Sequence, residues 1–426
     1  MEIKIFEGLE SFPKNLKPGF SRELTNIVSE ILDSVKKNGD SALAKYSKKF
    51  DKIIPKSWLV PRSYLKDALN DLDRNFLPIF EEAADNIMTF HERQKKDSQF
   101  EFGPDGTILG WKVNPLDSVG IYVPGGSAIY PSTLLMNVIP AQVAGVGRIV
   151  LVSPPSNTGL PHKLVMACAA FMGIEEIYSV GGVQAIGALA YGTESIKKVV
   201  KITGPGNNYV AEAKKQVFGS VGIDSYAGPS EIMIACNRSD IPSEYLAWDL
   251  LAQAEHDPQA GAFLLTTSKK QAVEVANFIK SLTPTLSRSE IIESSFENRS
   301  AIIVVNSFED IIEIINDFAP EHLELLSANP FEDLHHIRNA GSIFLGPNTP
   351  EAVGDYFAGP NHTLPTSGCA KFASPLGVSD FLKTSSVISY SYNKLKNQSK
   401  QIIRFAEEEG LFAHANAIRI RMEKKL

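Results

Sequence analysis

Short apolar runs and amphipathic stretches alternate regularly along the chain from about residue 118 onward. Four runs rich in Val and Ile, each ending in Gly or Pro, span 118–126, 148–155, 175–182 and 198–207. The stretches between them carry apolar residues at helical spacing. Strands that alternate with helices in this way are typical of a parallel sheet with crossover helices. We therefore expect an α/β fold in this region.

The same alternation returns after residue 230, although no sequence repeat relates the two regions. The expected strands are 231–236, 260–268, 301–307 and 341–346, and the expected helices between them are 242–256, 269–282 and 308–318. The chain is therefore expected to hold two α/β units in tandem.

The two ends of the chain show a helical pattern instead. Residues 1–110 are expected to be largely helical, with one helix ending at the Asn-Gly pair 38–39. A longer helical stretch is expected over 63–96, interrupted at Pro78. Residues 393–426 form a polar helical tail with a weak apolar stripe, as in a terminal segment that docks on something else.

Composition and charge argue against several classes of protein. The 426 residues, 43% hydrophobic and 21% charged, are ordinary for a globular protein of two or three domains. A net charge of −7 argues against a nucleic-acid or anionic-membrane surface. No apolar run approaches the roughly 20 residues of a membrane span, and the N-terminus lacks a signal core.

The three cysteines are widely separated and form no CxxC pair, so neither a disulfide framework nor a thiolate zinc site is expected. Cys168 and Cys236 lie in apolar runs, where a cysteine is ordinarily a small core residue. The expected compartment is therefore reducing and cytoplasmic.

Glycine is concentrated where the first group of strands ends, at 123–127, 181–187 and 203–208. Parallel sheets bind ligands at the carboxyl ends of their strands, and glycine lets the backbone approach a ligand closely. No GxGxxG follows any strand, so these loops support a nucleotide site and plain turn chemistry about equally. The polar residues that flank the loops fit turn positions as well as cofactor contacts; they are Tyr122, Gln184 and Asn207.

Two pairs of residues inside the second α/β region carry candidate chemistry. Gln253 and His256 are three positions apart on an expected helix, so they share one face, either as a satisfied polar cap or as half of a metal site. Glu321 and His322 follow Pro320, which is a pattern of a helix start. The alternative for this pair is a general acid and base at that helix start.

Two further pairs lie toward the C-terminus. Asp355 and His362 are expected in a loop with several helix breakers, where such residues ordinarily satisfy backbone groups. Glu409 and His414 lie in the polar tail, where a solvated helix face is the ordinary explanation. Spacing alone does not join these pairs with Gln253 and His256 into one site.

Nine short segments nevertheless follow one another in a specific order between about residues 90 and 417. They read GIYVPGGSA, VGGVQAI, GTESI, KITGPGN, AGPSE, LLAQAEH, APEHLEL, GDYFAGPNHTLPT and EGLFAHANA. With this ordered set the chain resembles the histidinol dehydrogenase family, zinc- and NAD-dependent enzymes that end histidine biosynthesis.

The resemblance implies a role for each candidate residue. The positions that match zinc ligands are Gln253, His256, Asp355 and His414, and those that match the catalytic pair are Glu321 and His322. The positions that match cofactor contacts are Tyr122, Gln184 and Asn207. Substrate would be held by Ser230, His362 and Glu409, together with Glu321 and the four metal ligands.

The resemblance also implies the architecture: two tandem incomplete Rossmann-like units with a helical N-terminal region and a helical C-terminal arm. The implied divisions are an N-terminal segment 1–25, a first α/β domain of 26–119 plus 232–375, a second Rossmann-like domain 120–231, and an arm 376–426. The arm would cross to the partner subunit of a homodimer, so that the active sites are shared.

The implied reaction oxidises L-histidinol to L-histidine through L-histidinal with two NAD and one Zn²⁺ per subunit. His322 would be the base, and Glu321 would activate the water that adds to the aldehyde. Alternatives are a zinc hydrolase that needs no NAD, an α/β binding module with structural polar residues, and a family member acting on another amino alcohol.

Overall fold

The computed structural model describes residues 3–9, 21–125, 130–225 and 228–424. The chain divides into two compact units, of which the first comprises Met1–Gln94 and Leu116–Phe381 and the second Lys95–Pro115 and Leu382–Leu426. The first unit contains two parallel sheets, so the expected α/β fold with two tandem incomplete Rossmann-like units is confirmed.

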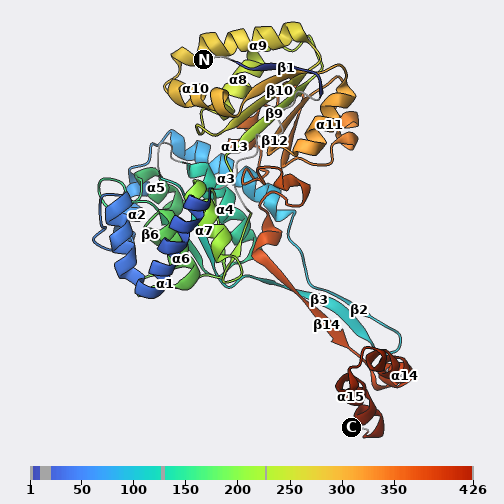
Figure 1. Ribbon diagram of the computed structural model, residues 1–426. Helices are drawn as coiled ribbons and strands as arrows, with labels where there is room; N and C mark the ends of the chain where they lie inside the picture. The colour runs from blue at the N-terminus through green and yellow to red at the C-terminus, as the bar shows by residue number, and fades with distance from the viewer. Residues whose placement is uncertain (1–2, 10–20, 126–129, 226–227, 425–426) are drawn as a thin grey trace. The chain divides into compact units, whose positions relative to one another are not determined.

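The six-stranded sheet of the first unit has the strand order β1-β11-β10-β9-β12-β13, with every neighbouring pair parallel (Figure 1). Ile232 and Ile234 of β9 pack with α8, α9 and α10, whereas Met233 and Ala235 pack with α11 on the other face. Because both faces are covered, the strand is apolar throughout rather than alternating. The strands are β1 (Ile5–Glu7), β9 (Glu231–Cys236), β10 (Gly261–Thr266), β11 (Ala301–Val304), β12 (His322–Leu326) and β13 (Ser342–Leu345).

Helices lie between these strands along the chain, except for the last, which follows β13. They are α8 (Ser243–Ala254), α9 (Lys269–Leu282), α10 (Ser289–Asn298), α11 (Phe308–Phe318), α12 (Pro330–Asp333) and α13 (Glu351–Tyr356). A capping box fixes the start of α11, where Ser307 and Asp310 each accept a hydrogen bond from the other's backbone N–H. Most of these elements agree with the expected pattern, but β12 was expected as the start of a helix.

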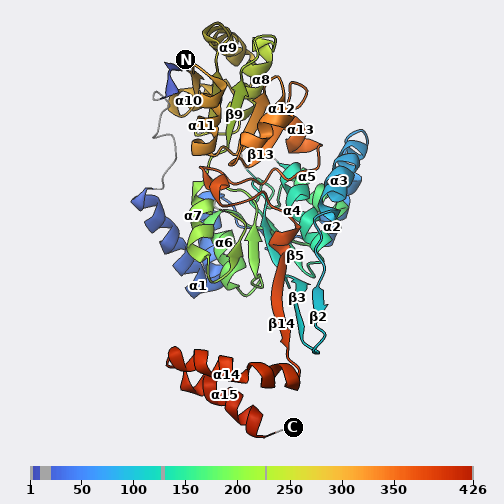
Figure 2. The same cartoon turned by 90° about the vertical axis from the view of Figure 1, so that its right-hand side faces the viewer.

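The five-stranded sheet has the order β6-β5-β4-β7-β8 and is also parallel. Helices α1, α6 and α7 lie on one side, and α4 and α5 lie on the other with α2 and α3 outside them (Figure 2). The strands are β4 (Val119–Tyr122), β5 (Ile149–Ser153), β6 (Glu176–Ser179), β7 (Lys201–Thr203) and β8 (Gly222–Ile223). The helices are α1 (Arg22–Phe50), α2 (Arg62–Asn70), α3 (Phe76–Glu92), α4 (Pro131–Ala144), α5 (Lys163–Phe171), α6 (Gly182–Tyr191) and α7 (Asn208–Val217).

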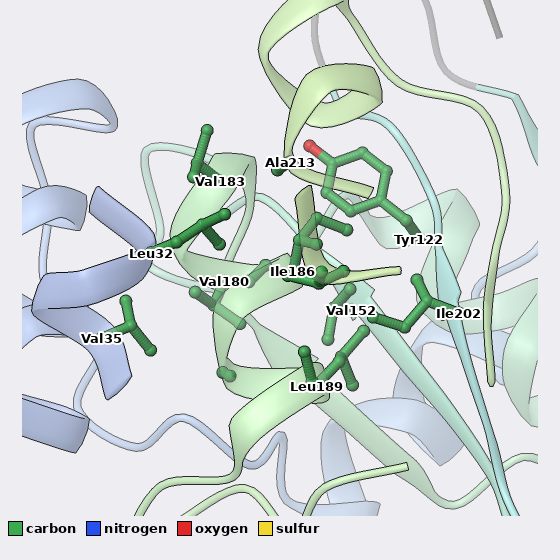
Figure 3. Packing of buried hydrophobic residues seen from close by; sticks show 14 of the residues in the cluster. Leu32, Val35, Tyr122, Val152, Val180, Val183, Ile186, Leu189, Ile202 and Ala213 are labelled. Carbon is green, nitrogen blue, oxygen red and sulfur yellow. The ribbon is translucent and has the colours of Figure 1, made fainter. Parts of the chain in front are cut away.

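A buried cluster joins α1 and α6 to this sheet (Figure 3). Leu32 and Val35 of α1 pack against α6 at Gly187. Gly187 allows the close approach, because a Cβ there would lie 3.2 Å from side-chain atoms of Val35. This packing fixes the helix that follows β6, at whose start a candidate cofactor residue lies.

The N-terminal region agrees with its expectation at one point and differs at another. The expected helix end at 38–39 is confirmed as a break in the helical backbone, because Gly39 has a φ of +52° and a ψ of −131° and a second helical stretch of α1 follows it. The expected helical stretch over 63–96 is divided at 71–75, upstream of Pro78. Pro78 lies in the first turn of α3, where a missing N–H breaks no helical bond, so the expectation that it interrupts the helix is wrong.

The second unit consists of an antiparallel sheet and two helices. The sheet has the order β14-β3-β2, so residues 1–110 are less helical than expected. The elements are β2 (Gln99–Phe102), β3 (Ile108–Pro115), β14 (Leu382–Ser389), α14 (Tyr392–Glu408) and α15 (Phe412–Glu423). The Ser391 hydroxyl caps α14 by accepting the N–H of Lys394 at 3.1 Å, and the expected helical tail is confirmed.

Within the described ranges, no helix is long and apolar enough to cross a membrane.

Candidate functional site

The amino ends of the neighbouring strands β9 and β12 bring four polar residues together. Ser230 and Glu231 lie at the start of β9, and Glu321 and His322 at the start of β12. The helix start expected at Glu321 is wrong, because α11 ends at Phe318 and the chain enters a strand. This group lies at the opposite strand ends from the ones where ligands of parallel sheets are ordinarily found.

The imidazole of His322 is held in one tautomer. Its Nδ1 lies 3.1 Å from the main-chain oxygen of Glu231, and a carbonyl oxygen only accepts, so Nδ1 carries the proton. Nε2 therefore carries a lone pair; it is buried and has no hydrogen-bond partner among the described residues. Burial lowers the pKa of His322 to about 4. The ring is thus neutral near pH 7 and has an unused acceptor.

The carboxyl group of Glu321 is buried beside this ring. Its Oε2 accepts the backbone N–H of Glu231 at 2.8 Å and lies 3.7 Å from Nδ1 of His322. Burial raises the pKa of Glu321 well above its ordinary value, and the nearby carboxylates of Glu231 and Asp355 raise it further. A hydrogen bond with the Ser230 side chain acts in the opposite direction. A carboxyl of raised pKa beside a neutral imidazole has the chemistry of an acid–base pair.

Three metal-ligating side chains converge next to His322. Ligand atoms of His256, Glu351 and Asp355 all lie within 4.8 Å of one another. Oδ1 of Asp355 lies 4.0 Å from Nε2 of His322 and 3.8 Å from Nδ1 of His362. The structure thus brings together His256, His322, Asp355 and His362, which the family resemblance singled out. Glu351, which it did not single out, lies with them.

Gln253 joins the group through Glu351. With its amide oriented to suit its neighbours, the nitrogen of Gln253 donates to the two carboxylate oxygens of Glu351 at 2.7 and 3.1 Å. Gln253 is buried near the end of α8, while His256 follows the helix, two residues beyond its last residue Ala254. The expectation that both residues lie on the helix is therefore wrong for His256.

Tyr130 and Arg288 hold His256 in place. The Tyr130 ring stacks on the imidazole with a centroid separation of 6.3 Å and an angle of 8°. Nε of Arg288 donates to the main-chain oxygen of Glu255 at 2.7 Å, and its Nη2 donates to that of His256 at 3.3 Å. Contacts to both the ring and the backbone fix the direction of this imidazole.

Three linked acidic residues next to the site were not predicted from the sequence: Glu351, Glu324 and Asp249. Glu351 is buried, and burial together with neighbouring carboxylates raises its pKa well above the ordinary value. Its backbone N–H donates to Oε1 of Glu324 at 3.0 Å, and Glu324 in turn shares a hydrogen bond with Asp249. These residues come from α8, β12 and α13, so no sequence spacing relates them.

A cavity of about 170 Å³ opens beside these groups. It is lined by the polar side chains of His322, Asp355 and His362 and by apolar ones that include Phe344 and Leu364. Burial lowers the pKa of His362, so this ring also favours the neutral form. Asp355 was expected in a loop but lies on α13, whereas His362 lies in a loop as expected. The volume of the cavity and its polar lining suit a small polar molecule.

The three candidate cofactor residues belong to the five-stranded sheet. Its order reverses between β4 and β7, the kind of switch point at which α/β sheets bind ligands. Tyr122 ends β4, and its hydroxyl accepts the N–H of Gly182 at 3.1 Å. Asn207 follows β7 and caps α7, accepting the N–H groups of Tyr209 and Val210 at 3.1 Å each.

Gln184 and Gly204 give this switch point features of a binding site. Gln184 is buried, and its Oε1 has no hydrogen-bond partner in the described part of the chain. Gly204 has a φ of +104°, and a Cβ there would lie 2.2 Å from the main-chain oxygen of Tyr122. The main chain at Gly204 therefore passes very close to the main chain at Tyr122. Residues 126 and 127 of the expected glycine loop lie outside the described residues.

Glu409 and His414 belong to the second unit. Glu409 is the C-cap of α14, and His414 lies in the first turn of α15; both are exposed. The cluster around His322 belongs to the first unit.

The cysteines play no part in the cluster. Cys168 and Cys236 are buried as expected, and burial raises the pKa of the Cys168 thiol to about 12. A thiol of such a pKa is a poor nucleophile near neutral pH.

The fold and the buried imidazole–carboxyl pair define an α/β enzyme with an acid–base site. A crystal structure of histidinol dehydrogenase from Elizabethkingia anophelis matches with a TM-score of 0.93 and 35% identity, covering 99% of this chain and 98% of that one. Histidinol dehydrogenases of Geobacillus kaustophilus (strain HTA426) and Bacillus subtilis (strain 168) are each 49% identical, over 100% and 99% of both chains respectively. The family model for histidinol dehydrogenase matches residues 17–422, and the chain belongs to this family.

Proposed function

We propose that this chain oxidises L-histidinol to L-histidine through L-histidinal, with two NAD and one Zn²⁺ per subunit, as the last step of histidine biosynthesis. The observation that carries the proposal is the cluster of partly buried His256 and Asp355 with buried His322 and Glu321, beside a small polar cavity. Membership of the chain in the histidinol dehydrogenase family supports this substrate.

Gln253, His256, Asp355 and His414 would hold the zinc. Their nitrogen and oxygen donors suit this ion. The amide of Gln253 donates its N–H groups to Glu351, which leaves its oxygen available as a ligand. When bound, the ion would orient the substrate through its nitrogen and oxygen atoms and withdraw charge from the reacting oxygen.

His322 would move the protons of the reaction at Nε2. Each oxidation removes a hydride to NAD and one proton from an oxygen, so a neutral acceptor is needed twice. The bond from Nδ1 to the Glu231 carbonyl keeps Nε2 unprotonated and directed away from that carbonyl. Ser230, His362 and Glu409 would hold the substrate so that its reacting hydroxyl faces this nitrogen, in company with the metal ligands.

Glu321 would serve the second oxidation. Water must add to the aldehyde before the second hydride leaves, and this addition releases a proton that Glu321 would accept. A carboxylate of raised pKa is a stronger base than an ordinary one, so burial favours this role. No cysteine lies in the cluster to add to the aldehyde as a thiohemiacetal, so water is the nucleophile.

Tyr122, Gln184 and Asn207 would contact NAD at the switch point of the five-stranded sheet. The unpartnered Oε1 of Gln184 is an acceptor for a hydroxyl or amide group of the cofactor. When bound, NAD would accept the hydride, and the protein would supply only its position.

The same proposal includes a homodimer in the cytoplasm whose subunits exchange C-terminal arms. Large apolar side chains are exposed on the second unit, including Phe102, Ile388, Phe405 and Phe412, as in a surface that a partner covers. Glu409 and His414 would then complete the site of the partner subunit. The division into 1–25, 26–119 plus 232–375, 120–231 and 376–426 belongs to this proposal.

NADH formation from NAD and L-histidinol tests the function, measured before and after a chelator removes metal. We expect two NADH per histidinol, loss of activity on chelation and recovery with Zn²⁺. No NADH from zinc-loaded dimer would refute histidinol as substrate, and other amino alcohols and then hydrolase substrates would be assayed instead.

A further inference from the structure

We infer that Glu231 and Arg299 are positioning residues for the catalytic pair, although neither is assigned a role by the family resemblance. The inference rests on the proposed function, because it concerns how Glu321 and His322 are held for that reaction. Both residues are buried, with side-chain exposures of 0% for Glu231 and 5% for Arg299. Both side chains contact each other and main-chain groups, so we assign them a role through other groups rather than through contact with substrate.

The backbone of Glu231 makes a contact with each member of the pair. Its N–H donates to Oε2 of Glu321 at 2.8 Å, and its carbonyl accepts Nδ1–H of His322 at 3.1 Å. A shift of Glu231 would thus displace the Glu321 carboxylate. It would also break the hydrogen bond that fixes the tautomer of His322.

The side chain of Glu231 determines where that backbone lies. Its Oε2 accepts Nη2 of Arg299 at 2.9 Å, and its Oε1 accepts the backbone N–H of Ser367 at 3.0 Å. Ser367 has a φ of +58°, which is unfavourable for a residue with a side chain, so this loop needs a fixed partner. Ser367 follows His362 in the same loop.

Arg299 extends the connection to the metal-ligand loop. Its Nη1 donates to the main-chain oxygen of Gln259 at 2.7 Å, three residues after His256. One guanidinium and one carboxylate therefore tie together three segments: the turn after His256, the start of β9 and the loop that carries His362. A guanidinium can bind two acceptors in fixed directions, which the single ammonium of lysine cannot reproduce.

The alternative is that the Arg299–Glu231 pair only stabilises the fold. The chain contains a second arginine–glutamate pair that serves as a matched control. Arg148 binds the carboxylate of Glu176 at 2.6 Å and the main-chain oxygens of Lys197 and Lys198 at 3.1 Å each. This second pair joins a carboxylate and main-chain oxygens as the first does, but it lies on the five-stranded sheet and touches none of the candidate site residues.

The test compares Arg299→Lys and Glu231→Gln with Arg148→Lys and Glu176→Gln in zinc-loaded protein. Stopped-flow measurement of NADH formation in a single turnover gives both an amplitude and a rate constant. We expect Arg299→Lys and Glu231→Gln to lower the rate constant about 10- to 100-fold at saturating histidinol and Zn²⁺, as a misplacement of about 1 Å does. The control variants should keep the wild-type rate constant.

A purely structural role gives a different result. It would lower the amplitude and the thermal midpoint while the rate constant of the folded sites stayed at the wild-type value, and that result would overturn the inference. If either single variant fails to fold, Glu231→Gln/Arg299→Gln removes both charges and leaves no unpaired ion. A wild-type rate constant in this double variant would also overturn the inference. Failure of the proposed function is distinct, because wild-type protein and both controls would then be inactive with histidinol.

Discussion

Nδ1 of His322 donates its proton to the main-chain oxygen of Glu231 across 3.1 Å, from one strand to the start of its neighbour. This bond leaves Nε2 as the acceptor of the ring, 4.0 Å from Oδ1 of Asp355. Burial lowers the pKa of His322 to about 4, so the acceptor is available throughout the neutral range. The fold thus prepares the ring as a base before any substrate arrives.

Replacing Glu321 with glutamine should separate the two oxidations. Glutamine keeps an oxygen that can accept the N–H of Glu231 but cannot take the proton from water. We expect alcohol oxidation to continue while histidine formation falls about 10²- to 10⁴-fold, the usual loss for a general base. NADH per histidinol should fall from two to one, with trapped aldehyde accumulating. Two NADH at the wild-type rate, as expected for the control Glu313→Gln on the exposed face of α11, would contradict this role.

Mixing His414→Ala and His362→Ala proteins should restore activity if sites are shared between subunits. Each variant alone should be inactive, and His414→Ala should also lose zinc. After random subunit exchange, half of the dimers are mixed, and each mixed dimer has one site free of both substitutions, so about one quarter of wild-type activity should return. Zinc content and activity are measured before and after exchange. No recovery after exchange is demonstrated by mass spectrometry would rule out the crossed arm.

Much of the α/β fold could be predicted because its central strands are continuous apolar runs. The run 231–236 is buried on both faces, and such a run between helices indicates a parallel strand. The run 322–326 did not give this signal, because His322 and Glu324 are polar although they are buried. Pro320 and Glu321 before it imitate a helix start, and tertiary packing in the sheet outweighed that local preference.

The candidate site could be predicted only in part for a related reason. Its side chains are brought together by topology, and no spacing rule links α8, β12 and α13. Glu351 illustrates this: the sequence EAVGD gives no sign that its carboxyl group will receive the amide of Gln253. Burial of an acidic residue depends on what packs over it, which local sequence does not specify.

Replacing Gly204 with alanine should weaken the proposed cofactor site. The new Cβ would lie 2.2 Å from the main-chain oxygen of Tyr122, and the φ of +104° is itself unfavourable for alanine. We expect a lower thermal midpoint and a KM for NAD raised about tenfold or more, with the KM for histidinol little changed. Gly173→Ala is the matched control, because its φ is +70° but no atom lies within 4 Å of the new Cβ. Equal effects of the two variants on the KM for NAD would show that strain alone, rather than the position of Gly204, is responsible.

Replacing Asp249 with asparagine should change how stability depends on pH. Burial raises the pKa of Asp249 from 3.8 to about 6, so in this interval the folded state holds a proton that the unfolded state has lost. The stability linked to this extra proton is fully present below about pH 4, and it is lost as the pH rises through 6. Asparagine does not titrate, so relative to wild type the variant should gain about 3 kcal/mol in unfolding free energy between pH 4 and pH 7, since each pKa unit corresponds to about 1.4 kcal/mol. Thermal midpoints in the presence of a chelator measure this, with Glu244→Gln, an exposed change on the same helix, as control. A difference between Asp249→Asn and wild type that stays constant over this range would mean that Asp249 does not hold the extra proton.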